Sequence, residues 1–139
     1  MSTGTSAPGG VELHVHLAAL LRARKLPELV ACWTGAADGQ RTPAAARSAA
    51  IALAEMRQLD EAQRVIDHWL ADATDVATRI LCARVAFDLG HYRVAIDRLE
   101  PLVTSPAARP SWWILYLRSA LGCGDPERAL RLHAAYAAL

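Results

Sequence analysis

Cysteine is scarce in this sequence and is not arranged for metal binding or for a disulfide framework. The three cysteines, Cys32, Cys82 and Cys123, lie far apart, are odd in number and form no CxxC pair. A zinc site would also favour histidines at i, i+4 spacing on a helix, whereas His14 and His16 are two residues apart. We therefore expect buried free thiols in a reducing compartment, and neither a metal ion nor another cofactor.

An excess of charge of one sign and long hydrophobic runs are also missing. The 15 lysine and arginine residues are balanced by 14 acidic ones, which gives a formal net charge of +1 and no general attraction to nucleic acid or anionic membranes. No apolar stretch is long enough to cross a bilayer. Residues 1–10 lack the basic start and apolar core of a signal peptide. We expect a cytoplasmic protein with a disordered tail over residues 1–10.

Signals for β-structure and for catalysis are equally weak. Aromatic residues make up only 6% of the chain, and much of its 53% hydrophobic content is alanine, the best helix former. Few β-branched residues alternate with polar ones, so nothing favours a sheet. Cys82 has no evident base beside it, and Gly122-Cys123-Gly124 is typical of a turn rather than a phosphate loop. We expect an all-α protein that is not an enzyme and has no catalytic residues.

Similar segments recur along the chain with a period of about 34 residues, which is the mark of a helical repeat. The small residues at equivalent positions are Ala62, Ala95 and Ala129. Gly90 and Gly124 lie five residues before Ala95 and Ala129, whereas Arg57 occupies the same position before Ala62. One further step back reaches Leu29, so we expect a fourth, more divergent hairpin at the start.

Prolines and glycines mark the expected ends of the helices. Thr42-Pro43 and Asp125-Pro126 are typical of an N-cap followed by proline at the first helical position. Gly35, Gly90 and Gly124 suit a left-handed turn after a helix. We expect loops at residues 36–40 and 104–109 and helices at residues 11–24, 27–35, 43–57, 60–71, 76–89, 92–103, 111–122 and 126–138.

The four tryptophans are expected mainly in the core. Trp33 and Trp69 lie on second helices of hairpins, where large side chains fill the space between repeats. Trp112 and Trp113 are adjacent, so they point in different directions from one helix. We expect one of them in the core and the other at a surface or partner contact.

The period and the placement of small residues resemble the tetratricopeptide repeat. Over the last three hairpins Trp113 fills its bulky fourth position, Ala50 and Ala83 its small eighth position, and Tyr92 its aromatic seventeenth. The match is degenerate, because the other repeats lack that aromatic residue. The resemblance implies a tetratricopeptide-like stack of about four antiparallel helical hairpins, which we expect to form a single domain over residues 11–139.

In tetratricopeptide proteins the first helix of each hairpin lines a concave groove. The matching positions here are mostly apolar, with arginines among them, and lack the Lys and Asn that clamp acidic C-termini. Such a groove suits an amphipathic helix, and we expect Phe87 near its centre, free of internal packing. Alternatively, the N-terminal hairpin closes over these residues. The candidate cargo-binding residues are Ile51, Ala54, Ile80, Arg84, Phe87, Ile114, Arg118 and Leu121.

A narrower resemblance rests on Trp69-Leu70, on Leu89-Gly90-His91-Tyr92 with Ala95, and on Pro110-x-Trp112-Trp113. These motifs resemble the tetratricopeptide-like needle chaperones of bacterial type III secretion systems. The resemblance implies a cytoplasmic chaperone that holds an amphipathic helix of a secreted needle, filament or tip subunit, beside a second small helical chaperone. The chain departs from that family in its extra N-terminal hairpin and in the longer, proline-containing segment at residues 102–109.

Two other functions stay open. A generic tetratricopeptide scaffold would join two folded proteins and would predict a polar groove with binding on the convex side. A regulatory repeat domain would belong to a longer chain. Independently of these alternatives, the final helix carries apolar residues that we expect no further helix to cover. We therefore expect the protein to associate with itself or with a second small helical protein. The candidate association residues are Leu130, Tyr136 and Leu139.

Overall fold

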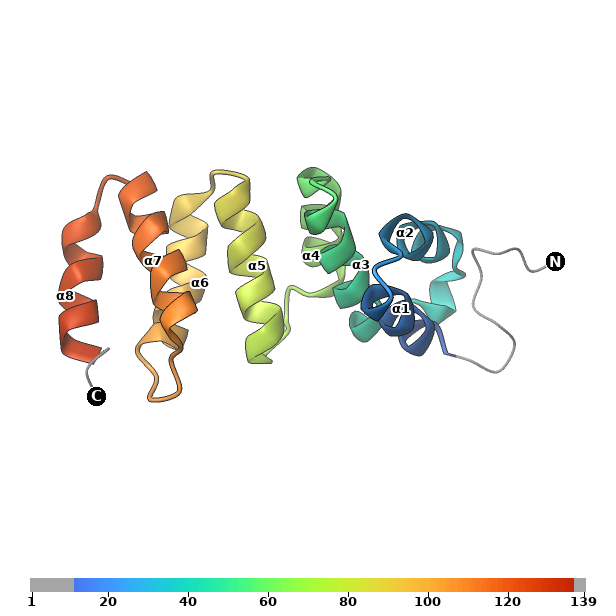
Figure 1. The fold of residues 1–139 in the computed structure, drawn as a ribbon, viewed down its shortest axis with the longest axis horizontal. Coiled ribbons are helices and arrows are strands. Elements are labelled where there is room, and N and C mark those ends of the chain that lie inside the picture. Colours follow the sequence, from blue (N-terminus) through green and yellow to red (C-terminus); the bar gives the residue numbers. More distant parts are fainter. Residues whose placement is uncertain (1–11, 137–139) are drawn as a thin grey trace. The chain divides into compact units, whose positions relative to one another are not determined.

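Eight α-helices form the framework of residues 12–136, the part of the chain that the computed structural model describes (Figure 1). No strand occurs in that range, which confirms the all-α prediction. Each helix bound lies within two residues of the expected one, and the expected tail at residues 1–10 lies outside the described range. The helices are α1 (Leu13–Arg22), α2 (Leu26–Gly35), α3 (Pro43–Glu55), α4 (Leu59–Trp69), α5 (Val76–Asp88), α6 (Tyr92–Val103), α7 (Pro110–Gly122) and α8 (Pro126–Tyr136), with a 3₁₀ turn η1 (Asp38–Gln40) in the first expected loop.

The chain divides into two compact units, residues 1–72 and residues 73–139. The first unit contains α1 to α4 and the second contains α5 to α8. In each unit, helices joined by a short turn pack against each other as hairpins, α1 with α2, α3 with α4, α5 with α6 and α7 with α8. The expected single domain over residues 11–139 stays a prediction.

The four hairpin turns share one backbone geometry. The second residue after the first helix of each hairpin has a left-handed conformation, with φ of 60° at Arg24, 62° at Arg57, 81° at Gly90 and 76° at Gly124. In each turn the next amide donates to a carbonyl five residues earlier, at 2.8 to 3.0 Å. This pattern is the Schellman motif, which satisfies carbonyls at a helix end. The repeat seen in the sequence is therefore present in the backbone, and the left-handed turns expected at the last two positions are confirmed.

The left-handed turn expected at Gly35 is wrong. Gly35 is the last residue of α2, and the chain leaves the helix through extended backbone at Ala36. The side chain of Arg41 caps this helix end instead. Its guanidinium donates to the carbonyl of Trp33 at 3.1 and 3.3 Å and to that of Thr34 at 2.9 Å, and it lies 5.2 Å from the centre of the Trp33 ring. A cation placed there satisfies the unpaired carbonyls and complements the helix dipole.

Helix α3 forms the centre of the first unit because it packs against α1, α2 and α4. Its fully buried residues are small and allow the neighbouring helices to approach closely; they are Ala45, Ala46, Ala49, Ala50 and Ala52. The expected N-cap is confirmed, since the Thr42 side chain accepts from the Ala45 amide at 3.2 Å. Trp33 is buried and meets the half-buried Trp69 edge to face, with ring centres 5.7 Å apart.

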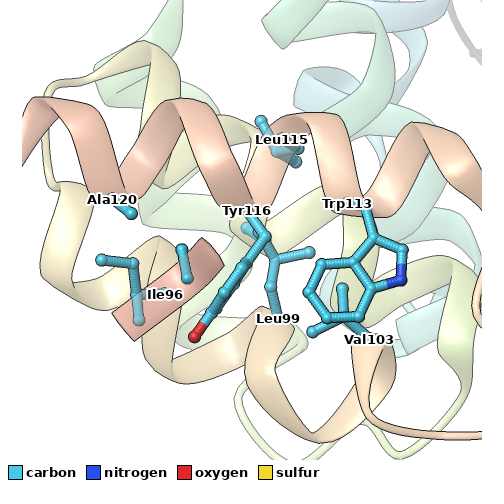
Figure 2. Packing of buried hydrophobic residues seen from close by; sticks show 9 residues of the cluster. Ile96, Leu99, Val103, Trp113, Leu115, Tyr116 and Ala120 are labelled. Atoms are coloured by element: carbon cyan, nitrogen blue, oxygen red, sulfur yellow. The ribbon is translucent and has the colours of Figure 1, made fainter. Parts of the chain in front are cut away.

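The core of the second unit lies between α6 and α7. Figure 2 shows the apolar residues of α6 against those of α7, with Ile96 near Ala120, Leu99 near Tyr116 and Val103 near Trp113. Trp113 is buried, whereas its neighbour Trp112 is half-buried beneath the guanidinium of Arg109. The expectation of one core tryptophan is therefore confirmed for Trp113, whereas the surface or partner contact expected for the other stays a prediction, because Trp112 also packs against this core.

Candidate protein-interaction site

An apolar stripe runs along α7 on the surface of the second unit. Ile114, Arg118 and Leu121 are spaced four and three residues apart, so they lie on one side of the helix. Ile114 is 52% exposed and Leu121 is 65% exposed. Large aliphatic side chains exposed at helical spacing are the kind of surface that an amphipathic partner helix covers. We call these three residues the α7 stripe.

Helix α5 contacts α7 and carries three more of the expected groove residues. Arg84 is exposed, whereas Ile80 and Phe87 are half-buried and pack against the core of the second unit. The Phe87 ring also meets Tyr92 of α6 edge to face, with ring centres 5.6 Å apart. The expectation that Phe87 is free of internal packing is therefore wrong, because its position beside the turn to α6 brings its ring against Tyr92.

The other two expected groove residues, Ile51 and Ala54, lie on α3 in the first unit and are half-buried. The structure therefore brings the candidate residues together as two local sets, one on α3 and one on the contacting helices α5 and α7. Among the candidate residues, the large exposed apolar side chains are Ile114 and Leu121, and both belong to the second set.

Arg84 and Arg118 occupy equivalent positions of successive repeats on the two contacting helices. Both are exposed. Within residues 12–136 neither guanidinium has an ion-pair or hydrogen-bond partner. The unpaired Arg118 within the α7 stripe and the unpaired Arg84 on the contacting helix α5 favour a partner that carries carboxylates next to its apolar face.

A cavity of about 430 Å³ opens beside the N-terminal half of α7. It lies between the segment 104–110, α7 and the C-terminal half of α8, and it shares Ile114 with the α7 stripe. The Trp113 ring forms part of its wall and meets the His133 ring edge to face, with centres 5.1 Å apart. Its lining residues are Thr104, Ser105, Pro106, Ala108, Pro110, Trp113, Ile114, Leu117, His133 and Tyr136. Sequence reasoning did not find this cavity, because its walls come from three separate segments.

Two of the three expected association residues lie on the surface of α8. Leu130 is 58% exposed and Tyr136 is also exposed, whereas Leu139 lies outside the described residues. Leu130 and Tyr136 therefore remain available for contact with another molecule.

One polar network links the last three helices, and the repeat pattern in the sequence does not predict it. The Tyr116 hydroxyl donates to Glu100 Oε2 at 3.0 Å, and Arg128 Nη2 donates to Glu100 Oε1 at 2.5 Å. Burial, followed by the hydrogen bond and the charge of Glu100, raises the pKa of Tyr116 to about 12. The network satisfies a buried hydroxyl between α6, α7 and α8, and we assign it to stability rather than to binding.

Two of the three thiols lie in the interior of the protein. Cys32 and Cys82 are buried as expected, whereas Cys123 is half-buried. Burial raises the pKa of the Cys32 thiol and so disfavours the reactive thiolate. Across residues 12–136, no group of three or more His, Cys, Asp or Glu side chains could hold a metal ion. Nor does any helix in this range have the length and hydrophobicity needed to cross a membrane.

Comparison with known proteins does not assign the chain to a family. No protein-family model matches this chain, and no curated protein or solved structure matches it with significance.

Proposed function

We propose that this chain is a tetratricopeptide-like binding module that holds an amphipathic helix of a partner protein on the surface formed by α5 and α7. The observation that carries the proposal is the α7 stripe, with two large aliphatic side chains exposed beside unpaired arginines. Four hairpin turns of one geometry, one in each repeat, support the tetratricopeptide-like stack. The partner helix would place its apolar face on Ile114 and Leu121 and its carboxylates near Arg84 and Arg118.

We further propose that the module is a cytoplasmic, non-catalytic chaperone of a type III secretion system. Its cargo would be a polymerising needle, filament or tip subunit, kept monomeric because the chaperone covers the helix that drives assembly. The support is the resemblance of the motifs around Trp69-Leu70, residues 89–95 and residues 110–113. Tyr92 in the second motif packs between Phe87 and Gly122, so this motif shapes the hairpin next to the binding surface.

A generic tetratricopeptide scaffold, or a regulatory repeat domain, is the competing function. The scaffold predicts a polar groove, whereas Ile114 and Leu121 make the exposed side of α7 apolar at two of its three positions. An apolar surface of this kind favours the capture of an amphipathic helix over the bridging of two polar protein surfaces.

Binding is tested with Leu121→Asp. The probe is a fluorescently labelled synthetic amphipathic helix with leucines at helical spacing and glutamates on its flank, and the readout is fluorescence anisotropy. Placing a charge against the apolar face should weaken binding by roughly tenfold or more, since a buried interface residue contributes on the order of 2 kcal/mol. Arg118→Glu should weaken binding most at low salt. The melting temperature should not change, because Leu121 is 65% exposed.

The matched control is Val94→Asp, which places the same charge at a position that is 43% exposed on α6 and outside the proposed surface. It should bind the probe like the unchanged protein. Equal binding by all three variants would refute the assignment of the site to α7.

The chaperone role needs a separate measurement in the bacterium that encodes the protein. Native co-purification followed by mass spectrometry should recover a small, secreted, self-polymerising subunit, and Leu121→Asp should abolish its recovery. Deletion of the gene should remove that subunit from the cytoplasm while leaving the other secreted proteins. A partner that is neither secreted nor polymerising would refute the chaperone role and leave the binding module in place.

A further inference from the structure

The cavity beside α7 has the size and the wall of a small-molecule site. Its volume of about 430 Å³ lies within the range of about 300–1,000 Å³ that is typical of ligand pockets. Apolar side chains form most of the wall, and none of the described lining residues is Asp, Glu, Lys or Arg. A phosphate or a carboxylate would find no opposite charge there, so the wall favours an uncharged ligand.

Trp113 places an unpaired hydrogen-bond donor at this wall. Its side chain is only 5% exposed, and its indole N–H has no hydrogen-bond partner within residues 12–136. Every fully buried side-chain nitrogen or oxygen in the described part of the chain has a partner, so this nitrogen belongs to the small part of Trp113 that stays accessible. In Figure 2 it lies on the side of the ring that points away from Tyr116 and Leu99. An acceptor oxygen on a ligand would satisfy this donor.

The remaining polar groups of the wall fit the same kind of ligand. The hydroxyls of Thr104 and Ser105 donate to backbone carbonyls of α6 at 2.8 and 2.7 Å, so their protons are already engaged. His133 and Tyr136 make no hydrogen bond with any described residue. The ring of His133 meets that of Trp113 edge to face, and Tyr136 adds a third ring to the lining. Aromatic walls favour an aromatic ligand, because rings pack edge to face or offset.

From the cavity, its uncharged wall and the unpaired indole N–H, we propose that the protein binds an uncharged aromatic molecule that carries an acceptor oxygen. The N–H of Trp113 donates to that oxygen, and the rings of the ligand lie between the segment 104–110, α7 and the C-terminal half of α8. This inference goes beyond the proposed function, because the site takes a small molecule rather than a helix. Of the α7 stripe, only Ile114 is among the described residues that line it.

The test is isothermal titration calorimetry of the full chain with xanthone, an uncharged aromatic ketone of three fused rings. Xanthone should bind saturably at one site. Xanthene has the same rings but a methylene in place of the carbonyl, and it should bind roughly tenfold more weakly, because the indole N–H then has no acceptor. Xanthone-2-carboxylate should also bind more weakly than xanthone, because the wall supplies no cation. In ¹H–¹⁵N spectra, xanthone should shift the indole signal of Trp113.

The variant His133→Glu places a carboxylate at the cavity wall and should weaken xanthone binding by roughly tenfold. Its matched control is His68→Glu, because His68 is also exposed and its ring meets that of Trp69 edge to face at 4.9 Å, but it lies on α4 in the first unit. This control should bind xanthone like the unchanged protein. Both histidines are exposed, so neither substitution should change the melting temperature.

Four results would overturn the proposal. They are the absence of saturable xanthone binding, equal affinities for xanthone and xanthene, an indole signal of Trp113 that does not move on binding, and equal xanthone affinities of His133→Glu and His68→Glu. Leu121→Asp, which should lose the amphipathic helix, should bind xanthone like the unchanged protein. That comparison keeps this test separate from the test of the α7 stripe.

Discussion

Gly122 at the end of α7 offers the sharpest test of the packing in the second unit. A Cβ atom added at Gly122 would lie 2.6 Å from Cδ2 of Tyr92 and 2.7 Å from both Cε2 and Cγ of the same ring. These contacts are much shorter than van der Waals separation. The ring cannot easily move away, because Phe87 meets it edge to face. Gly122→Ala should therefore force α7 and α6 apart at this point.

Two effects of opposite sign compete in this substitution. Alanine is a better helix former than glycine by up to about 1 kcal/mol in a helix interior, and by less at a helix end. Overpacking typically costs about 1–3 kcal/mol, because neighbouring groups must shift. Since the close contact involves Cγ of a rigid ring and not the tip of a flexible chain, we expect overpacking to win. The free energy of unfolding should fall by roughly 1–2 kcal/mol.

The assay is urea denaturation of the unchanged protein, Gly122→Ala, Tyr92→Ala and the double variant. Without the Tyr92 ring the clash is absent, so in that background Gly122→Ala should be neutral or slightly stabilising. The coupling between the two sites should then be roughly 1–3 kcal/mol. The reasoning is refuted if Gly122→Ala stabilises the protein with Tyr92 present, or if its effect is the same in both backgrounds.

Two further predictions concern the buried hydroxyl and the left-handed turns. The pKa of Tyr116 lies above its ordinary value of 10, so the stability that its hydrogen bond contributes is complete below pH 10 and is lost as pH rises through about 12. Relative to Tyr116→Phe, the free energy of unfolding should fall by roughly 2–3 kcal/mol over this interval. Equal pH profiles of the two proteins would contradict this. Gly90→Ala should destabilise the protein by about 1 kcal/mol, because its φ of 81° strains an L-residue although no atom lies within 4 Å of the added Cβ. The control is Gly39→Ala, because Gly39 has the same open space around an added Cβ but no positive φ. Thermal unfolding compares the two variants, and an equal loss of stability in both would indicate a cause other than backbone strain.

Much of the local structure could be predicted from the sequence because it depends on residues close together in the chain. Proline after Thr42 and glycine at positions 90 and 124 act within one turn of a helix, so the helix bounds agreed to within two residues. The regular spacing of the repeats also predicted where the hairpins lie, because each hairpin carries its own turn signal. Gly35 shows where this reasoning fails, since a side chain six residues away, Arg41, caps the end of α2 in place of a left-handed turn.

The sequence by itself predicted the helices, and the resemblance to the tetratricopeptide pattern placed Ile114, Arg118 and Leu121 together on one side of α7, since residues three and four apart lie on the same side of a helix. It did not determine which apolar sides are covered. Leu99 and His133 occupy equivalent positions, yet one is buried and the other is exposed, because α7 packs on that side of α6 and none of the described helices packs on that side of α8. The tertiary structure also decided that Phe87 packs against Tyr92 and that Glu100 joins Tyr116 to Arg128. Such contacts join separate helices, and no periodicity within a single helix encodes them.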